Sequence, residues 1–327
     1  MPKRNKRLSK HKQKEREKKV IALFSIVIAI FLSAYILISV SQEFNFKYIP
    51  TMAEVKSFFG LSENNTKMQS DCSVHFIDVG QGDSTLIISD GKSILIDAGE
   101  IDQGTVVSHY LKELNIKKID LLVATHPHSD HIGGMATIVD EFEISKIFMP
   151  KLPDDMVPTT KTYTKLLTSI ANKGLKITQS KPGMAYDFGK GRLEVFGPTG
   201  VFEELNDMSL VAKFTYDNDE SFLLTGDMEK SAEKDLLNTR SNLDADVLKV
   251  GHHGSNTSSH KAFFESVSPE YCVISVADDN KYNHPHKTTL NRIKENQAKL
   301  YRTDFDGSII FDIVNGDFKV TTTGITP

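Results

Sequence analysis

The chain has 327 residues, of which 39% are hydrophobic and 25% are charged. These values are ordinary for a globular protein and exclude general disorder, while two cysteines are too few for a disulfide framework. The formal net charge is −4, but residues 1–19 hold ten basic and two acidic side chains, a local charge of +8, which leaves −12 for the rest of the chain. This acidic remainder disfavours a tight, non-specific grip on a polyanion such as duplex nucleic acid.

Residues 20–40 carry no charge, and as a helix they would span about the 30 Å of a bilayer core. We interpret them as a transmembrane helix rather than a cleaved signal peptide, because the stretch exceeds the usual apolar region of a signal and no A-x-A site follows. The positive-inside rule then predicts a single-pass protein of the cell membrane, with residues 1–19 in the cytoplasm and the remaining domain outside it. A nucleic-acid-binding arm is the weaker alternative for residues 1–19.

Residues 41–71 show no period that would build a core and are interpreted as a linker or stalk, so that a single domain is expected over 72–327. Short β-rich runs come first, then a helix with one apolar face over 104–114 and a buried strand over 119–124. The strands are expected at 74–79, 84–89, 93–97, 119–124, 146–149, 175–178, 192–196, 209–216, 221–225, 245–250 and 271–277, with two or three more near the C-terminus. Further helices are expected at 160–173, 230–238, 259–267 and 288–295. This order predicts two packed sheets covered by helices on their outer faces.

Four possible metal ligands follow the strand at 119–124 directly: His126, His128, Asp130 and His131. Divalent ions such as zinc need nitrogen and oxygen ligands that converge within about 2.0 to 2.2 Å, so a cluster of this kind on a tight turn favours a metal site over chance. Asp227 and the pair His252-His253 follow two later strands. A carboxylate can bridge two ions, and beside such a cluster we expect Asp227 to do so rather than only to cap the next helix.

The spacing H-x-H-x-D-H over 126–131, with the later Gly-Asp and His, resembles the metallo-β-lactamase superfamily. A wider set of motifs resembles the soluble domain of the ComEC/Rec2 competence proteins over nearly all of residues 73–313. Those motifs lie at 76–84, 95–99, 125–128, 206–211, 252–255, 283–286 and 301–304. The resemblance implies an α/β (α+β) fold, the four-layer αββα sandwich of the superfamily, here after one transmembrane helix. It implies no DNA-translocating pore, because the chain has one apolar span.

The resemblance also implies two divalent metal ions, zinc or manganese, since His and Asp ligands suit both. The first ion would be held by His126, His128 and Asp227. Many members of the superfamily add a third histidine, but none occurs here between His131 and His252, so Asn206 or Ser209 is expected near the vacant place and the site should be open or weakly binding. The second ion would be held by Asp130, His131, Asp227 and one of His252 and His253. Resemblance to phosphorylcholine esterases favours His253.

The remaining candidates are residues that meet the substrate or support the ligands. Asp130, His252 and His284 are the candidate catalytic residues. Asp78 and Asp83 either orient the ligands or only cap the turn between them. We interpret Asp97 as structural, Lys249 as a solvated surface lysine, and Cys72 and Cys272 as free thiols rather than a disulfide.

These residues predict a hydrolase in which a metal-bridging hydroxide attacks a phosphodiester. The substrate would be DNA outside the cytoplasm or a phosphodiester of the cell envelope, including a phosphorylcholine-type ester. A β-lactamase function is less favoured, because the third histidine is missing. The different alternative is a binding module that retains metal without turnover.

Overall fold

The computed structural model describes residues 72–217 and 219–324. The sequence predictions for the basic segment 1–19, the membrane helix 20–40 and the linker 41–71 lie outside these residues. Within the described ranges, none of the helices combines the length and the apolar character that a membrane span requires.

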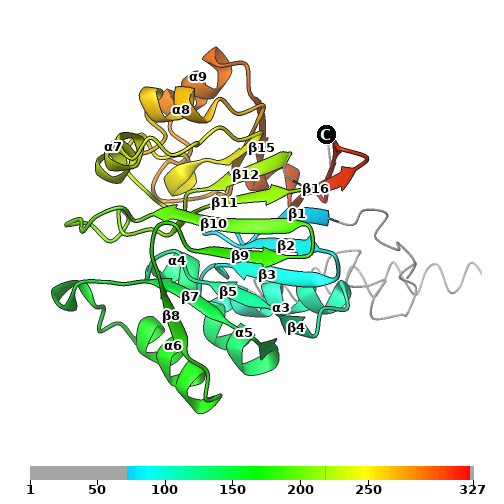
Figure 1. The fold of residues 1–327 in the computed structure, drawn as a ribbon, viewed down its shortest axis with the longest axis vertical. Helices are drawn as coiled ribbons and strands as arrows, with labels where there is room; N and C mark the ends of the chain where they lie inside the picture. The colour runs from blue at the N-terminus through cyan, green and yellow to red at the C-terminus, as the bar shows by residue number, and fades with distance from the viewer. Residues whose placement is uncertain (1–71, 218, 325–327) are drawn as a thin grey trace, which may run out of the picture. The chain divides into compact units, whose positions relative to one another are not determined.

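The first sheet has eight strands, in the order β17-β16-β1-β2-β3-β5-β7-β8 (Figure 1). Its strands are β1 (Cys72–Phe76), β2 (Thr85–Ser89), β3 (Lys92–Ile96), β5 (Leu121–Val123), β7 (Ile147–Pro150), β8 (Ile177–Ser180), β16 (Ile309–Val314) and β17 (Asp317–Thr322). Pairing is antiparallel from β17 to β3 and parallel from β3 to β8. Beside this sheet, β4 (Lys118–Ile119) and β6 (Glu143–Ile144) form a short parallel pair.

The second sheet has seven strands, in the order β15-β14-β13-β12-β11-β10-β9. Its strands are β9 (Ala185–Phe188), β10 (Gly191–Gly197), β11 (Val211–Tyr216), β12 (Glu220–Leu224), β13 (Val247–Lys249), β14 (Tyr271–Ile274) and β15 (Lys299–Arg302). Here too the pairing changes along the sheet, from antiparallel between β9 and β12 to parallel between β12 and β15.

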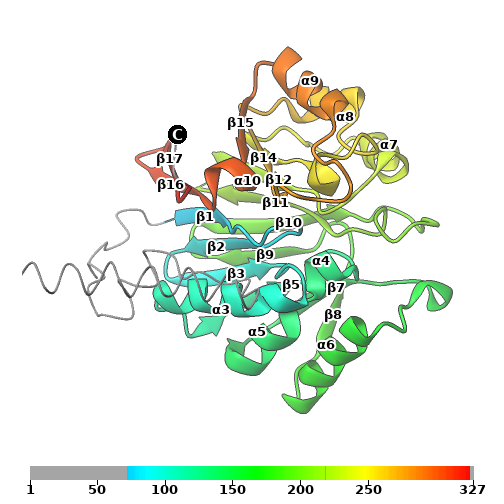
Figure 2. The same ribbon diagram turned by 180° about the vertical axis from the view of Figure 1, so that it is seen from behind.

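Helices cover the outer face of each sheet (Figures 1 and 2). On the first sheet lie α3 (Gly104–Glu113), α5 (Met135–Glu141) and α6 (Lys161–Asn172), and on the second lie α7 (Lys230–Asn238), α8 (Lys261–Val267) and α9 (Lys287–Glu295). The single-turn helices α4 (Ser129–Ile132) and α10 (Thr303–Asp306) and the 3₁₀ turns Ile101–Gln103, Asp154–Met156 and Gly251–Gly254 occupy connections.

The alternation of apolar side chains along the strands builds three layers of core. On β2, Ile87 points between the sheets, whereas Leu86 and Ile88 pack with the helices on the other side. On β12, Phe222 faces the first sheet and Leu223 packs with the outer helices. Because side chains alternate across a strand, sheets that are apolar on both faces must be covered on both. The predicted four-layer αββα architecture is therefore confirmed.

Most predicted elements are confirmed within a few residues, and α7 has the predicted bounds of 230–238. The strands predicted at 245–250 and 271–277 are shorter, because the chain leaves the sheet after Lys249 and Ile274. Strand β9 was not predicted, because its apolar and polar residues do not alternate clearly. Cys72 and Cys272 are buried free thiols, as predicted.

Candidate metal centre

The candidate ligands lie where parallel strands of both sheets end. Asp97 follows β3 and His126 follows β5 in the first sheet, while Asp227 follows β12 and His253 follows β13 in the second. In open α/β sheets, ligands bind outside the carboxyl ends of parallel strands. Both sheets therefore supply side chains to one site at this edge.

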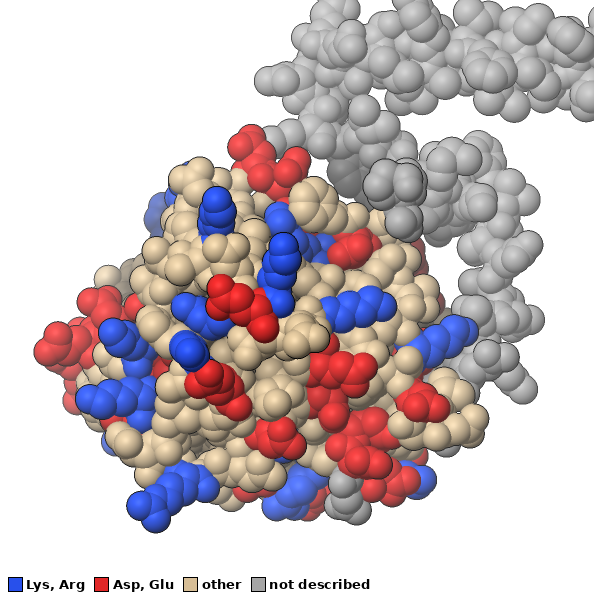
Figure 3. Space-filling view, turned by 90° about the horizontal axis from the view of Figure 1, so that it is seen from above, with Lys and Arg blue, Asp and Glu red and all other residues tan. Residues whose placement is uncertain are grey.

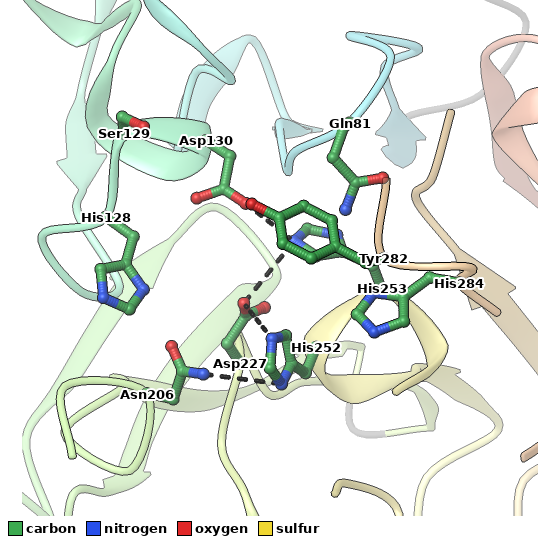
Figure 4. A pocket seen from close by; sticks show the side chains of 10 residues that line it. All are labelled: Gln81, His128, Ser129, Asp130, Asn206, Asp227, His252, His253, Tyr282 and His284. Carbon is green, nitrogen blue, oxygen red and sulfur yellow. Dashed lines mark hydrogen bonds and ion pairs between the residues drawn. The ribbon is translucent and has the colours of Figure 1, made fainter. Parts of the chain in front are cut away.

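Four side chains converge there: Asp130, His131, Asp227 and His253, whose ligand atoms all lie within 4.8 Å of one another. His253 Nε2 is 3.4 Å from Asp130 Oδ2 and 3.5 Å from Asp227 Oδ2. His131 Nε2 is 3.3 Å from Asp227 Oδ1. Figure 4 shows Asp130, Asp227 and His253 pointing toward one another from different elements.

Three of these polar atoms are buried without a hydrogen-bond partner: His131 Nε2, Asp227 Oδ1 and His253 Nε2. Buried polar atoms are rarely left unpaired, because desolvation without a partner costs free energy. Two imidazole nitrogens and two carboxylates aimed at one point are the donor set that a divalent ion such as zinc takes. The residues present therefore fit a metal ion.

Contacts behind the histidines fix which nitrogen faces the centre. His131 Nδ1 donates to Asp97 Oδ2 at 2.8 Å, and His253 Nδ1 donates to the carbonyl oxygen of Ser275 at 2.9 Å. Both histidines therefore direct Nε2 inward, where its lone pair can bind a metal once the proton on this nitrogen is released. Our interpretation of Asp97 as merely structural was wrong, because its carboxylate directly orients His131.

The interpretation of Lys249 as a solvated lysine was also wrong. Only 2% of its side chain is exposed, and its Nζ lies 2.9 Å from Asp83 Oδ1. The same Asp83 oxygen is 3.4 Å from His253 Nδ1. Asp83 therefore supports His253, with its buried charge balanced by Lys249. Asp78 is exposed and accepts a hydrogen bond from Gly80 N at 3.0 Å, which makes it a cap of that turn.

The charges of the cluster shift its pKa values in opposite directions. Burial raises the pKa of Asp227, but His253 and His131 outweigh it and hold that pKa well below the usual range. Burial lowers the pKa of His253, but Asp227, Asp130 and Asp83 raise it to about 10. Negative charge therefore dominates this site, and a histidine proton there would be released when metal binds.

Residues 77–277 match the family model described as the metallo-beta-lactamase superfamily. The chain belongs to this superfamily. The ComEC-like resemblance is also confirmed. The chain is 28% identical over 273 residues to ComE operon protein 3 of Bacillus subtilis. This alignment covers 77% of this chain and 35% of the relative. The chain thus spans about a third of that relative's length.

Two other similarities are more limited. Over 52 residues, which are 16% of each chain, this chain is 50% identical to Ribonuclease Z of Clostridioides difficile. In fold, the chain is similar to CmlA, a diiron beta-hydroxylase from Streptomyces venezuelae, with a TM-score of 0.50, 11% identity, and coverage of 80% of this chain and 60% of that one. The second similarity concerns the fold alone.

The other histidines of this metallo-β-lactamase domain lie beside the cluster. His126 is buried, and its Nε2 is 3.0 Å from His128 Nδ1. Burial, with His131 nearby, lowers the pKa of His126 well below its usual value, so its imidazole stays neutral and available to a metal. The residues expected at the first ion are thus adjacent, but they form no complete ligand group of their own among the described residues.

Asn206 and Ser209, expected near the vacant place of the first ion, lie on different sides of the ligands. Asn206 lines the pocket, and its Oδ1 is buried without a partner. Ser209 is fully buried and does not line the pocket: its Oγ accepts from Asp227 N at 3.1 Å and lies 3.4 Å from His126 Nδ1. Asn206 therefore has the better position to complete a first-ion site, and Ser209 supports the ligands from behind.

His252 and His253 are separated by the backbone, although they are adjacent in the sequence. Both have left-handed conformations, with φ of 49° and 51°, which non-glycine residues adopt with strain that is typical of functional sites. His253 is buried in the cluster, whereas 24% of the His252 side chain is exposed and its Nε2 is 3.9 Å from Asp227 Oδ2. The geometry therefore favours His253 as the ligand and turns His252 toward the pocket.

An open pocket of about 310 Å³ lies over the cluster. Its lining residues are Gln81, His128, Ser129, Asp130, Asn206, Asp227, His252, His253, Tyr282 and His284, as Figure 4 shows. None of them is a lysine or arginine. His284, the third candidate catalytic residue, lies in this wall with its ring 5.4 Å from that of His252.

Three residues of the site were not predicted from the sequence: Gln81 and Tyr282, which line the pocket, and Glu229, which contacts His252. Glu229 Oε1 is 2.9 Å from His252 Nδ1, a contact between segments that are not adjacent in the sequence. Gln81 stands inside the motif at 76–84 that carried the family resemblance, and Tyr282 directly precedes the motif at 283–286. The motifs themselves were therefore a signal for these two residues, whereas Glu229 carried none.

Proposed function

We propose that this chain is a membrane-anchored, metal-dependent phosphodiesterase that acts on a nucleic acid outside the cytoplasm. The observation that carries the hydrolytic part is the buried group Asp130, His131, Asp227 and His253, with unpartnered ligand atoms facing an open polar pocket. Zinc or manganese suits these ligands. Divalent ions held there would activate a water nucleophile and stabilise negative charge on the reacting phosphate.

The chain's own residues then have separate tasks. Asp130 and Asp227 supply the carboxylates, and Asp97 and Asp83 keep the two ligand histidines in place. Glu229 accepts a hydrogen bond from His252 Nδ1, so that Nε2 faces the pocket near Asp227. His252 is there placed to contact the oxygen of the leaving group or of the phosphate.

Two observations support a phosphodiester of nucleic acid as the substrate class. One relative that shares a short segment with this chain is named Ribonuclease Z, and another, from Bacillus anthracis, is named Exodeoxyribonuclease YycJ. The face seen in Figure 3 does not favour long duplexes, because basic and acidic side chains are interspersed on it rather than gathered into a basic band. Tight duplex binding depends on many basic contacts.

The test is hydrolysis of bis-p-nitrophenyl phosphate by the purified full chain with Mn²⁺ or Zn²⁺. We expect turnover that ends with Asp130→Ala, because this change removes one of the four converging ligands. Asp140→Ala, an exposed aspartate at the end of α5, is the matched control and should keep the activity. Metal binding without turnover in wild type would contradict the proposal and favour a binding module.

A further inference from the structure

Tyr282 is an exposed aromatic residue at the rim of the candidate pocket. Its side chain is 47% exposed and lines the pocket. Figure 4 shows the ring beside His284, in front of His253. The exposed part of this aromatic ring is therefore available to a ligand at a polar site.

The loop that carries Tyr282 is braced. Asn280 Oδ1 accepts from Tyr282 N at 3.2 Å and from His284 N at 2.9 Å, while Asn280 Nδ2 donates to His284 O at 2.7 Å and to Ala277 O at 2.8 Å. One side chain thus ties four backbone groups of the loop together. The backbone that carries the ring is held in place, so less conformational entropy is lost when a partner stacks on the ring.

The rings beside Tyr282 form a wall that leads toward the metal cluster. Tyr282 is stacked on His284 with ring centroids 5.6 Å apart and an interplanar angle of 25°. His284 in turn lies edge-on to His252, 5.4 Å away. A flat group attached to a phosphate held at the cluster would therefore meet an aromatic surface.

The charge beside Tyr282 favours a flat, uncharged group over a cationic group as the partner of this ring. The Lys281 ammonium lies 5.0 Å from the centre of the Tyr282 ring. A quaternary ammonium headgroup would compete with this cation for the same ring and would be repelled by it. A nucleotide would not be repelled, because its base can stack while the exposed lysine turns to a neighbouring phosphate.

We infer that Tyr282 is a stacking platform for the nucleobase next to the scissile phosphate, which makes single-stranded nucleic acid the substrate of the proposed site. This inference rests on the proposed phosphodiesterase function. It explains how a pocket without a lysine or arginine in its lining can bind a polyanionic strand: affinity comes from base stacking, which every base can provide and which pairing in a duplex would hinder.

The test compares two esters with the same leaving group in the full chain with Mn²⁺ or Zn²⁺. One is thymidine 5′-(p-nitrophenyl phosphate), which carries a base, and the other is ethyl p-nitrophenyl phosphate, which does not. We expect Tyr282→Ala to lower the ratio of kcat/KM between the thymidine and ethyl esters about tenfold, chiefly through KM, as ~1.4 kcal/mol of lost stacking would do. Tyr282→Trp should restore the ratio.

The matched control is Phe305→Ala, which removes an aromatic side chain that is even more exposed, at 63%, but does not line the pocket. It should leave the ratio unchanged. An unchanged ratio in Tyr282→Ala would overturn the inference while the proposed function stands, whereas failure of wild type to cleave either ester would overturn the proposed function. Preference for p-nitrophenylphosphorylcholine over the thymidine ester, lost in Tyr282→Ala, would also overturn the inference and assign the ring to a quaternary ammonium group.

Discussion

Asp97 lies behind His131 rather than in the pocket, and this position defines its role. Its Oδ2 accepts from His131 Nδ1 and from Thr125 Oγ1 at 2.6 Å, and its Oδ1 accepts from Thr125 N at 2.9 Å. The carboxylate thus ties the histidine loop to the end of β3. A neighbour of this kind fixes the tautomer and raises the basicity of a ligand histidine.

At this residue we expect Asp97→Asn to weaken metal binding about 10- to 100-fold, because the amide no longer provides a charged acceptor for His131 Nδ1. Isothermal titration with Zn²⁺ or Mn²⁺ measures the effect. Asp120→Asn is the control, since Asp120 accepts from Ser93 N at 3.1 Å and is no ligand or neighbour of a ligand. Equal affinities of Asp97→Asn and wild type would refute the orienting role.

Among the elements, α7 and the start of α8 are joined by a buried carboxylate. Glu233 of α7 is 2% exposed and accepts from His260 N and His260 Nδ1, both at 3.0 Å, and from Ser259 N. Burial raises its pKa from 4.5 to about 7, against the opposing effect of the hydrogen bonds from His260 and Ser259. The folded protein therefore keeps this proton to a higher pH than the unfolded chain does.

This contribution to stability is complete below pH 4.5 and is lost as the pH rises through 7. Glu233→Gln cannot ionise and should not lose this contribution. We therefore expect the difference in unfolding free energy between Glu233→Gln and wild type to shift in favour of the variant by about 2 kcal/mol from pH 5 to pH 8. Urea unfolding of both proteins at the two pH values measures it, and other titrating groups cancel in the difference. A difference that does not change with pH would show that Glu233 is ionised throughout.

For the whole molecule, the uneven distribution of charge is the basis of the proposed location. Residues 1–19 carry +8 and the rest of the chain −12, with the uncharged residues 20–40 next to the basic segment. The positive-inside rule places such a basic flank in the cytoplasm. The domain that follows would then lie on the other side of the membrane.

We expect protease added to bacteria stripped of their wall to digest a full chain tagged after Pro327 while a cytoplasmic marker stays intact. Detergent should make both accessible. Protection of the tagged chain until detergent is added would contradict the extracytoplasmic location.

The sequence by itself determined much of this protein, because the features concerned are local. Alternating apolar residues predicted most strands, helical periodicity predicted α7 to its bounds, and the spacing over 126–131 predicted a ligand cluster after a buried strand. The ends of two later strands supplied the candidates Asp227 and the pair His252-His253, and the family resemblance added the four-layer αββα order and favoured His253.

Only the tertiary structure decided which distant groups meet. The end of β3 brings Asp97 to His131, and the end of β12 brings Glu229 to His252, although these pairs are 34 and 23 residues apart. From the sequence, Lys249 resembled a surface residue, because its partner Asp83 lies in the other sheet, in the turn between β1 and β2. Periodicity reports how one segment faces a core, but contacts between the ends of neighbouring strands, or of two sheets, depend on how the strands pair and how the sheets pack.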